Sequence, residues 1–182
     1  MKRPTNIQSA LMAHLFAGSL LFISAVSSLA AAQPPDGIAM MTGPGAEMES
    51  ASGELDVFQC GAQLFLDRPY PIKEVPPAME GFKFIRDKID RVSVVCRKAG
   101  VVFVLTPKAG RSPDSREAEL SELGFQKVDM PDVPLFEGGW NRCSVYQKEM
   151  AVDEPLNLKK WGVVVVPDHD VPATKQKPSS AR

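Results

Sequence analysis

The strongest indication of the fold class is the stretch Val92-Ser93-Val94-Val95-Cys96-Arg97-Lys98-Ala99-Gly100-Val101-Val102-Phe103-Val104-Leu105. Its two apolar runs are rich in β-branched residues, which favour strands. A short polar segment ending at Gly100 separates them, as is typical of a tight turn. The stretch therefore predicts two consecutive strands paired as an antiparallel hairpin.

Other short apolar runs flank this stretch, at residues 55–60, 82–85, 125–128, 143–147 and 162–166. Segment 115–124 differs, because it begins with Ser115, carries acidic residues in its first turn and ends at Gly124, which predicts a short helix. Residues 76–81 predict a turn or a single helical turn. Several short strands separated by turn residues predict an all-β fold, an antiparallel β-sandwich of jelly-roll-like type with one short connecting helix.

The first 32 residues have the three parts of a secretory signal peptide. Lys2 and Arg3 supply the positive start, residues 11–29 are uncharged and mostly apolar, and residues 30–32 are three alanines. We expect cleavage before Gln33, and the alternative is an uncleaved membrane anchor. Cleavage would place the protein in the periplasm or outside the cell, with no membrane segment left.

The rest of the chain divides by composition. Residues 33–53 are rich in Pro, Gly, Ser and Met, without apolar periodicity, and we expect a disordered leader. Residues 54–167 hold the predicted strands and form the β-sandwich domain. Residues 168–182 are polar and predict a disordered tail.

Charge and motif content exclude several classes of function. The whole chain has a net charge of −1, and removing Lys2 and Arg3 with the signal peptide makes it −3. This lacks the basic character of a nucleic-acid-binding protein. The sequence holds no Gly-rich phosphate-binding motif and no spacing typical of a zinc site, so we expect no cofactor and no metal.

The three cysteines, Cys60, Cys96 and Cys143, leave two interpretations open. Export permits disulfides, but an odd number leaves one thiol over or paired with another chain. Alternatively, all three are small buried residues in strands.

Catalytic groups are scarce. A Ser or Cys nucleophile needs a base, and only His169, near the C-terminus, remains after cleavage. Two acidic pairs, Asp87 with Asp90 and Glu117 with Glu119, could serve a glycosidase. We expect them instead to be solvated charges and partners of the helix dipole, and we expect no enzyme activity.

The segment Trp140-Asn141-Arg142 follows two glycines and is the candidate ligand-binding site. A sugar ring can stack on an exposed aromatic ring, while Asn and Arg donate hydrogen bonds to its hydroxyls. The alternative is that Trp140 covers the core. Trp161 precedes a valine run, and we expect it in the core.

Several segments, in order, resemble an accessory β-sandwich domain found in secreted bacterial glycoside hydrolases, sulfatases and sialidase-like proteins. They are Tyr70-Pro-Ile-Lys-Glu-Val-Pro76, Gly81-Phe-Lys-Phe-Ile-Arg86 to Asp90, Val101 to Val104, Gly124-Phe125, Val145-Tyr-Gln-Lys148 and Leu156-Asn-Leu158. The similarity covers residues 64–165. It implies a β-sandwich that associates with carbohydrate.

These observations favour a secreted, non-catalytic module that associates with polysaccharide or with a secreted polysaccharide-processing enzyme. The alternatives are a structural or protein-interaction domain of the cell envelope or exoproteome, and a small hydrolase with a carboxylate pair.

Overall fold

The computed structural model describes residues 37–136 and 142–168, and these residues are almost entirely β-structure. The elements are β1 (Glu47–Ser50), β2 (Glu54–Val57), η1 (Pro77–Met79), β3 (Lys83–Arg86), β4 (Arg91–Lys98), β5 (Gly100–Pro107), α1 (Glu117–Glu122), β6 (Gln126–Lys127), β7 (Val133–Pro134), β8 (Arg142–Met150), β9 (Pro155–Lys159) and β10 (Val163–Val166). The prediction of an all-β fold with antiparallel sheets and one short helix is confirmed.

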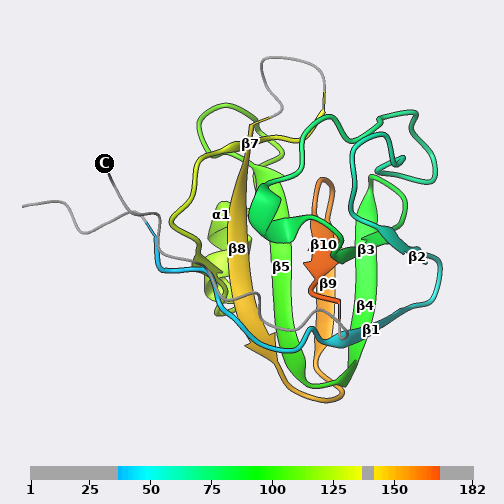
Figure 1. Ribbon diagram of the computed structural model, residues 1–182, viewed down its shortest axis with the longest axis vertical. Coiled ribbons are helices and arrows are strands. Elements are labelled where there is room, and N and C mark those ends of the chain that lie inside the picture. The colour runs from blue at the N-terminus through cyan, green and yellow to red at the C-terminus, as the bar shows by residue number, and fades with distance from the viewer. Residues whose placement is uncertain (1–36, 137–141, 169–182) are drawn as a thin grey trace, which may run out of the picture. The chain divides into compact units, whose positions relative to one another are not determined.

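The strands form two antiparallel sheets (Figure 1). The larger sheet has the order β2-β3-β10-β5-β8-β6, and β7 also pairs with β8. The smaller sheet has the order β1-β4-β9. Strand β5 lies inside the larger sheet between β10 and β8, and each of its residues is buried.

The larger sheet is buried on both faces. On one face, Phe103 and Leu105 of β5 pack into a cluster with side chains from the loops around η1 and from residues 128–136. On the other face, Val102 and Val104 pack against the smaller sheet and α1. Because side chains alternate across a strand, β5 supplies both clusters. In Figure 1 the segment that carries η1 lies over β5 and β10, so loops form the third layer of the fold.

The predicted hairpin between β4 and β5 is wrong. Strand β4 pairs with β1 and β9, whereas β5 pairs with β10 and β8, so the chain turns from one sheet into the other at Ala99. The burial pattern explains this, because β4 alternates between exposed and buried residues while β5 needs cover on both faces. The N-terminal segment also occupies the corner: the Val101 N–H donates to the Pro44 carbonyl at 2.9 Å.

Gly100 is required at this corner, which gives a first prediction. A Cβ at this position would lie 2.6 Å from the backbone carbon of Gly45 and 2.6 Å from the amide nitrogen of Ala46. We expect Gly100→Ala to lower the free energy of unfolding by about 1–3 kcal/mol in urea denaturation. Gly43→Ala is the control, since its Cβ would meet only a Val101 side-chain methyl at 3.3 Å. Equal stability of the two variants would contradict this account.

Part of the predicted disordered leader is ordered. Residues 37–53 include β1 and run beside the larger sheet, where the Ile38 N–H donates to the Lys127 carbonyl at 2.8 Å and the Asp129 N–H donates to the Ile38 carbonyl at 2.8 Å. Composition misled the prediction because this segment is held through its backbone groups rather than by a periodic apolar face. The predicted signal peptide and residues 33–36 and 169–182 lie outside the described residues.

The single α-helix lies between β5 and β6, inside the predicted segment, and η1 lies within predicted turn 76–81. The helix begins at Glu117, and Arg116 precedes it without a side-chain capping hydrogen bond, so Ser115 is not the cap that the sequence predicted. Gly124 has φ +81° and ends the helical segment as predicted. No helix in ranges 37–136 and 142–168 has the length and apolar content to cross a bilayer.

Candidate functional site: an aromatic-walled pocket

The predicted binding segment is only partly visible. Trp140 and Asn141 lie outside the described residues, so their role stays a prediction. Arg142 is exposed at the start of β8, where its carbonyl accepts a hydrogen bond from the Lys108 N–H at 2.9 Å. Its side chain does not line the pocket described next.

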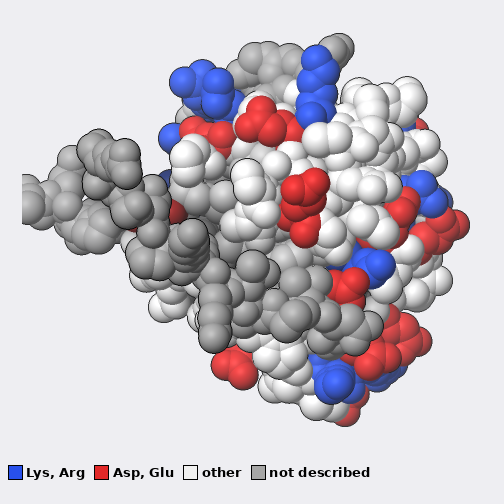
Figure 2. Space-filling view, in the orientation of Figure 1, with Lys and Arg blue, Asp and Glu red and all other residues white. Residues whose placement is uncertain are grey.

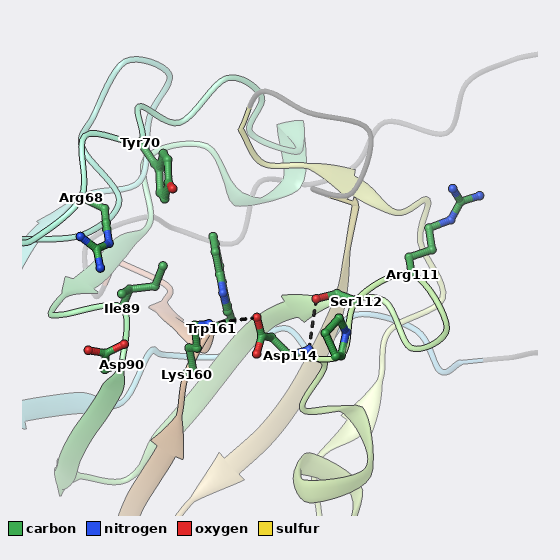
Figure 3. A pocket seen from close by; sticks show the side chains of 10 residues that line it. Arg68, Tyr70, Ile89, Asp90, Arg111, Ser112, Asp114, Lys160 and Trp161 are labelled. Carbon is green, nitrogen blue, oxygen red and sulfur yellow. Dashed lines mark hydrogen bonds and ion pairs between the residues drawn. The ribbon is translucent and has the colours of Figure 1, made fainter.

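A pocket of about 440 Å³ opens where four connecting segments meet (Figure 3). These are the loop before residue 70, the β3–β4 turn, the β5–α1 loop and the β9–β10 turn. Aromatic, aliphatic and charged side chains share its wall: Arg68, Tyr70, Ile89, Asp90, Arg111, Ser112, Pro113, Asp114, Lys160 and Trp161. Apolar surface with a few polar groups is typical of a small-ligand site.

The apolar wall belongs to a stacked aromatic cluster. The Trp161 ring lies 6.0 Å from Tyr70 and 5.2 Å from Phe136 between centroids, with interplanar angles of 18° and 17°. Phe65 meets Trp161 edge-on at 5.4 Å. Trp161 is only 6% exposed, which confirms it as a core residue, yet it also lines the pocket. The core therefore extends directly into the wall of the site.

The tight β9–β10 turn places Trp161. Its backbone has φ +68°, a left-handed conformation that costs a non-glycine residue roughly 1–3 kcal/mol. The Trp161 N–H donates to the Ile89 carbonyl at 3.1 Å, which ties the turn to the β3–β4 connection. The next residue, Gly162, leaves room for Leu158, whose Cδ1 would lie 2.6 Å from an added Cβ. The turn is thus fixed on both sides of the indole.

One ion pair crosses the pocket. The Lys160 Nζ lies 3.3 Å from the Asp114 Oδ2, and the Lys160 carbonyl accepts a hydrogen bond from the Arg116 Nε at 2.8 Å. Asp90 forms no ion pair with any other described residue. In Figure 3 the Arg111 guanidinium extends away from Trp161. The polar groups closest to the aromatic wall are therefore of both signs.

The first predicted acidic pair is divided between two environments. Asp87 is only 2% exposed, which corrects the expectation of a solvated charge. Its carboxylate accepts hydrogen bonds from the Ser52 Oγ at 3.0 Å and from the Lys88 N–H at 2.7 Å. It thereby fastens the β1–β2 connection to the end of β3. Asp90, in contrast, is exposed at the pocket.

The second acidic pair braces the helix. The Glu117 carboxylate accepts a hydrogen bond from the Ser144 Oγ at 2.6 Å, and Glu119 lies 4.0 Å from Arg116. Burial and the negative charge of Glu117 raise the pKa of Tyr146 to about 12. These groups join α1 to β8 and do not line the pocket. The sequence did not indicate this polar contact.

The cysteines are free thiols, and two of them are buried. Burial raises the pKa of Cys143 to about 12, and burial also raises the pKa of Cys96. Both are therefore protonated at neutral pH and poor nucleophiles. Cys60 is exposed in the turn after β2, so the interpretation of three buried strand cysteines is wrong for Cys60. In the described part of the chain, no three His, Cys, Asp or Glu side chains are grouped to hold a metal.

No family model and no curated protein matches this chain. Two solved structures are similar to it. One is a beta-glucuronidase from glycoside hydrolase family 2, with 12% identity, a TM-score of 0.47 and coverage of 66% of this chain. The other is a GH138 enzyme targeting pectin rhamnogalacturonan II, with 13% identity, a TM-score of 0.48 and coverage of 74%. The chain spans only 14% and 17% of those proteins, and likenesses this weak assign no activity.

Proposed function

We propose that this chain is a secreted, non-catalytic β-sandwich module that binds polysaccharide through the pocket walled by Tyr70 and Trp161. The observation that carries the proposal is the meeting of an aromatic wall with hydrogen-bonding side chains in one pocket. A sugar ring presents an apolar face that stacks on aromatic rings, and hydroxyls that pair with groups such as Asp90. Secretion or export to the periplasm rests on the signal-peptide pattern of residues 1–32.

The chemistry of the described side chains supports binding rather than turnover. The two buried thiols are protonated, and Asp114, one of the two pocket carboxylates, is held by Lys160. The other, Asp90, is exposed, which favours an ordinary ionised carboxylate over a general acid. A glycosidase needs one carboxyl of each kind.

The test is calorimetric titration with a glycan panel, using Tyr70→Leu as the variant. Leucine keeps much of the apolar volume but removes the flat ring, so we expect affinity to fall about tenfold, equivalent to about 1.4 kcal/mol. Phe82→Leu is the matched control, because Phe82 is also half-buried against the same core cluster but does not line the pocket. We expect it to bind normally.

Three results would contradict the proposal. Equal losses in both variants would mean that the aromatic wall is only structural. Binding of no glycan would favour the alternative, a protein-interaction domain. Glycan cleavage by the purified chain that disappears in Asp90→Asn would show that the protein is an enzyme.

A further inference from the structure

Two like charges face each other on the outer surface of the smaller sheet. Arg91 and Lys159 are directly opposite in the antiparallel ladder between β4 and β9. The alternating burial of both strands places these two exposed residues on the same outward face. The Cβ atoms of opposite residues lie about 4.5–5.5 Å apart, and like charges in this position are destabilising. The sheet thus carries an electrostatic cost at this end.

The other end of β4 is neutralised. The Arg97 guanidinium pairs with Glu49 at 2.5 Å and with Asp153 at 3.1 Å. Across residues 37–136 and 142–168, neither Arg91 nor Lys159 has a comparable carboxylate partner. The sheet therefore offers paired carboxylates to one exposed cation and leaves two others facing each other.

The unneutralised pair lies beside the pocket. Asp90, which lines the pocket, directly precedes Arg91, and Lys160, which also lines it, directly follows Lys159. The next outward-facing pair is Ser93 and Asn157, about 6.6–6.8 Å further along the strands. These two are uncharged and joined by a hydrogen bond of 2.6 Å. We call Arg91, Ser93, Asn157 and Lys159 the outer strip.

From this arrangement we infer that the ligand is an anionic polysaccharide, whose carboxylate or sulfate group is bound by Arg91 and Lys159 while an adjacent sugar occupies the pocket. The inference rests on the proposed function. The acidic group lies outside the pocket because Asp90 would repel it there and Lys160 is already paired with Asp114. Hydroxyls of the next sugar along the chain meet Ser93 and Asn157.

A polysaccharide fits this surface better than a nucleic acid does. The full chain has a net charge of −1, and the face in Figure 2 mixes acidic and basic side chains around a large uncharged area. A nucleic-acid surface needs a continuous basic stripe for successive phosphates. Two cations beside an aromatic-walled pocket suit occasional acidic groups on a sugar chain.

The test is titration with hyaluronan oligosaccharides and with the same oligosaccharides after chemical reduction of their carboxyl groups. The double variant Arg91→Gln with Lys159→Gln is compared with Arg97→Gln with Lys98→Gln, which removes the same charge from the other end of β4. We expect the first variant to bind hyaluronan about 3- to 10-fold more weakly, as loss of two exposed charge contacts predicts, and to lose its sensitivity to salt. We expect the second to bind as the wild type does.

The same double variant serves as its own folding control. Because removal of the like-charge pair relieves repulsion, we expect its melting temperature to be equal to or above that of the wild type. Weaker binding by a protein of undiminished stability supports a ligand contact. Chondroitin and chondroitin sulfate, which share a backbone, identify whether carboxylate or sulfate is preferred, and a preference for either supports the inference.

Two outcomes overturn the inference, and they are distinguishable. If the wild type binds the carboxyl-reduced oligosaccharides as tightly as the acidic ones, or if the Arg91→Gln, Lys159→Gln variant keeps the preference, the charge assignment fails while polysaccharide binding stands. If the wild type binds no oligosaccharide of either kind, the proposed function fails, and the inference fails with it.

Discussion

Trp161→Ala is expected to lower the free energy of unfolding by about 3–5 kcal/mol and to abolish glycan binding at once. The indole is nearly buried in the aromatic cluster, so its removal leaves a large cavity that the fixed turn cannot close. The same ring walls the pocket, so the site collapses or fills with water. Chemical denaturation gives the first quantity and calorimetric titration the second.

Two further variants separate the causes. Phe125→Ala removes a buried ring from the cluster on the opposite face of the larger sheet, and we expect a comparable loss of stability with glycan binding retained. Trp161→Gly loses the same ring as Trp161→Ala but accepts the φ of +68° without strain, so we expect it to be about 1 kcal/mol more stable than the alanine variant. Loss of binding in Phe125→Ala would show that the assay reports stability alone.

Local sequence signals predicted most of the strands and the helix. The β-branched runs of β4, β5 and β10 and the acidic segment ending at Gly124 each have a strong local preference, which the structure follows. Strand β1 was missed because its sequence Glu47-Met-Glu-Ser50 has little apolar content, and it is formed by pairing with β4. The pairing of β4 and β5 was mispredicted for a related reason, since the choice between a hairpin and a corner depends on distant segments.

The pocket had no local signal. Its wall comes from residues near 68–70, 89–90, 111–114 and 160–161, which only the folded chain brings together. Trp161 was correctly placed in the core, but no pattern around it showed that one part of the ring would reach a cavity. The like-charge pair of Arg91 and Lys159 depends on strand register, which the sequence alone did not supply.

Gln147→Leu is the second substitution with a large expected effect, about 2–4 kcal/mol of destabilisation. Gln147 is completely buried in β8, and its amide holds the N-terminal segment: Nε2 donates to the Ala39 carbonyl at 2.7 Å and Oε1 accepts from the Met41 N–H at 2.6 Å. Leucine fills the space but leaves both backbone groups without their partner. Hydrogen exchange of the Met41 amide should accelerate, and exchange in β5 should change least.

Gln147→Glu tests the same contact through its pH dependence. A neutral carboxyl can donate to the Ala39 carbonyl and accept from the Met41 N–H, as the amide does, whereas the ionised carboxylate can only accept. Burial and the lost donor both raise the pKa of the introduced carboxyl above its ordinary value of about 4.3. The folded state then binds more protons than the unfolded state, so stability relative to the wild type is greatest below about pH 4 and declines as the pH rises through the raised pKa. A difference from the wild type that stays constant between pH 4 and about 8 would contradict the buried two-bond contact. Glu149→Gln, on the same strand at a partly exposed position, is the control and should show no such trend.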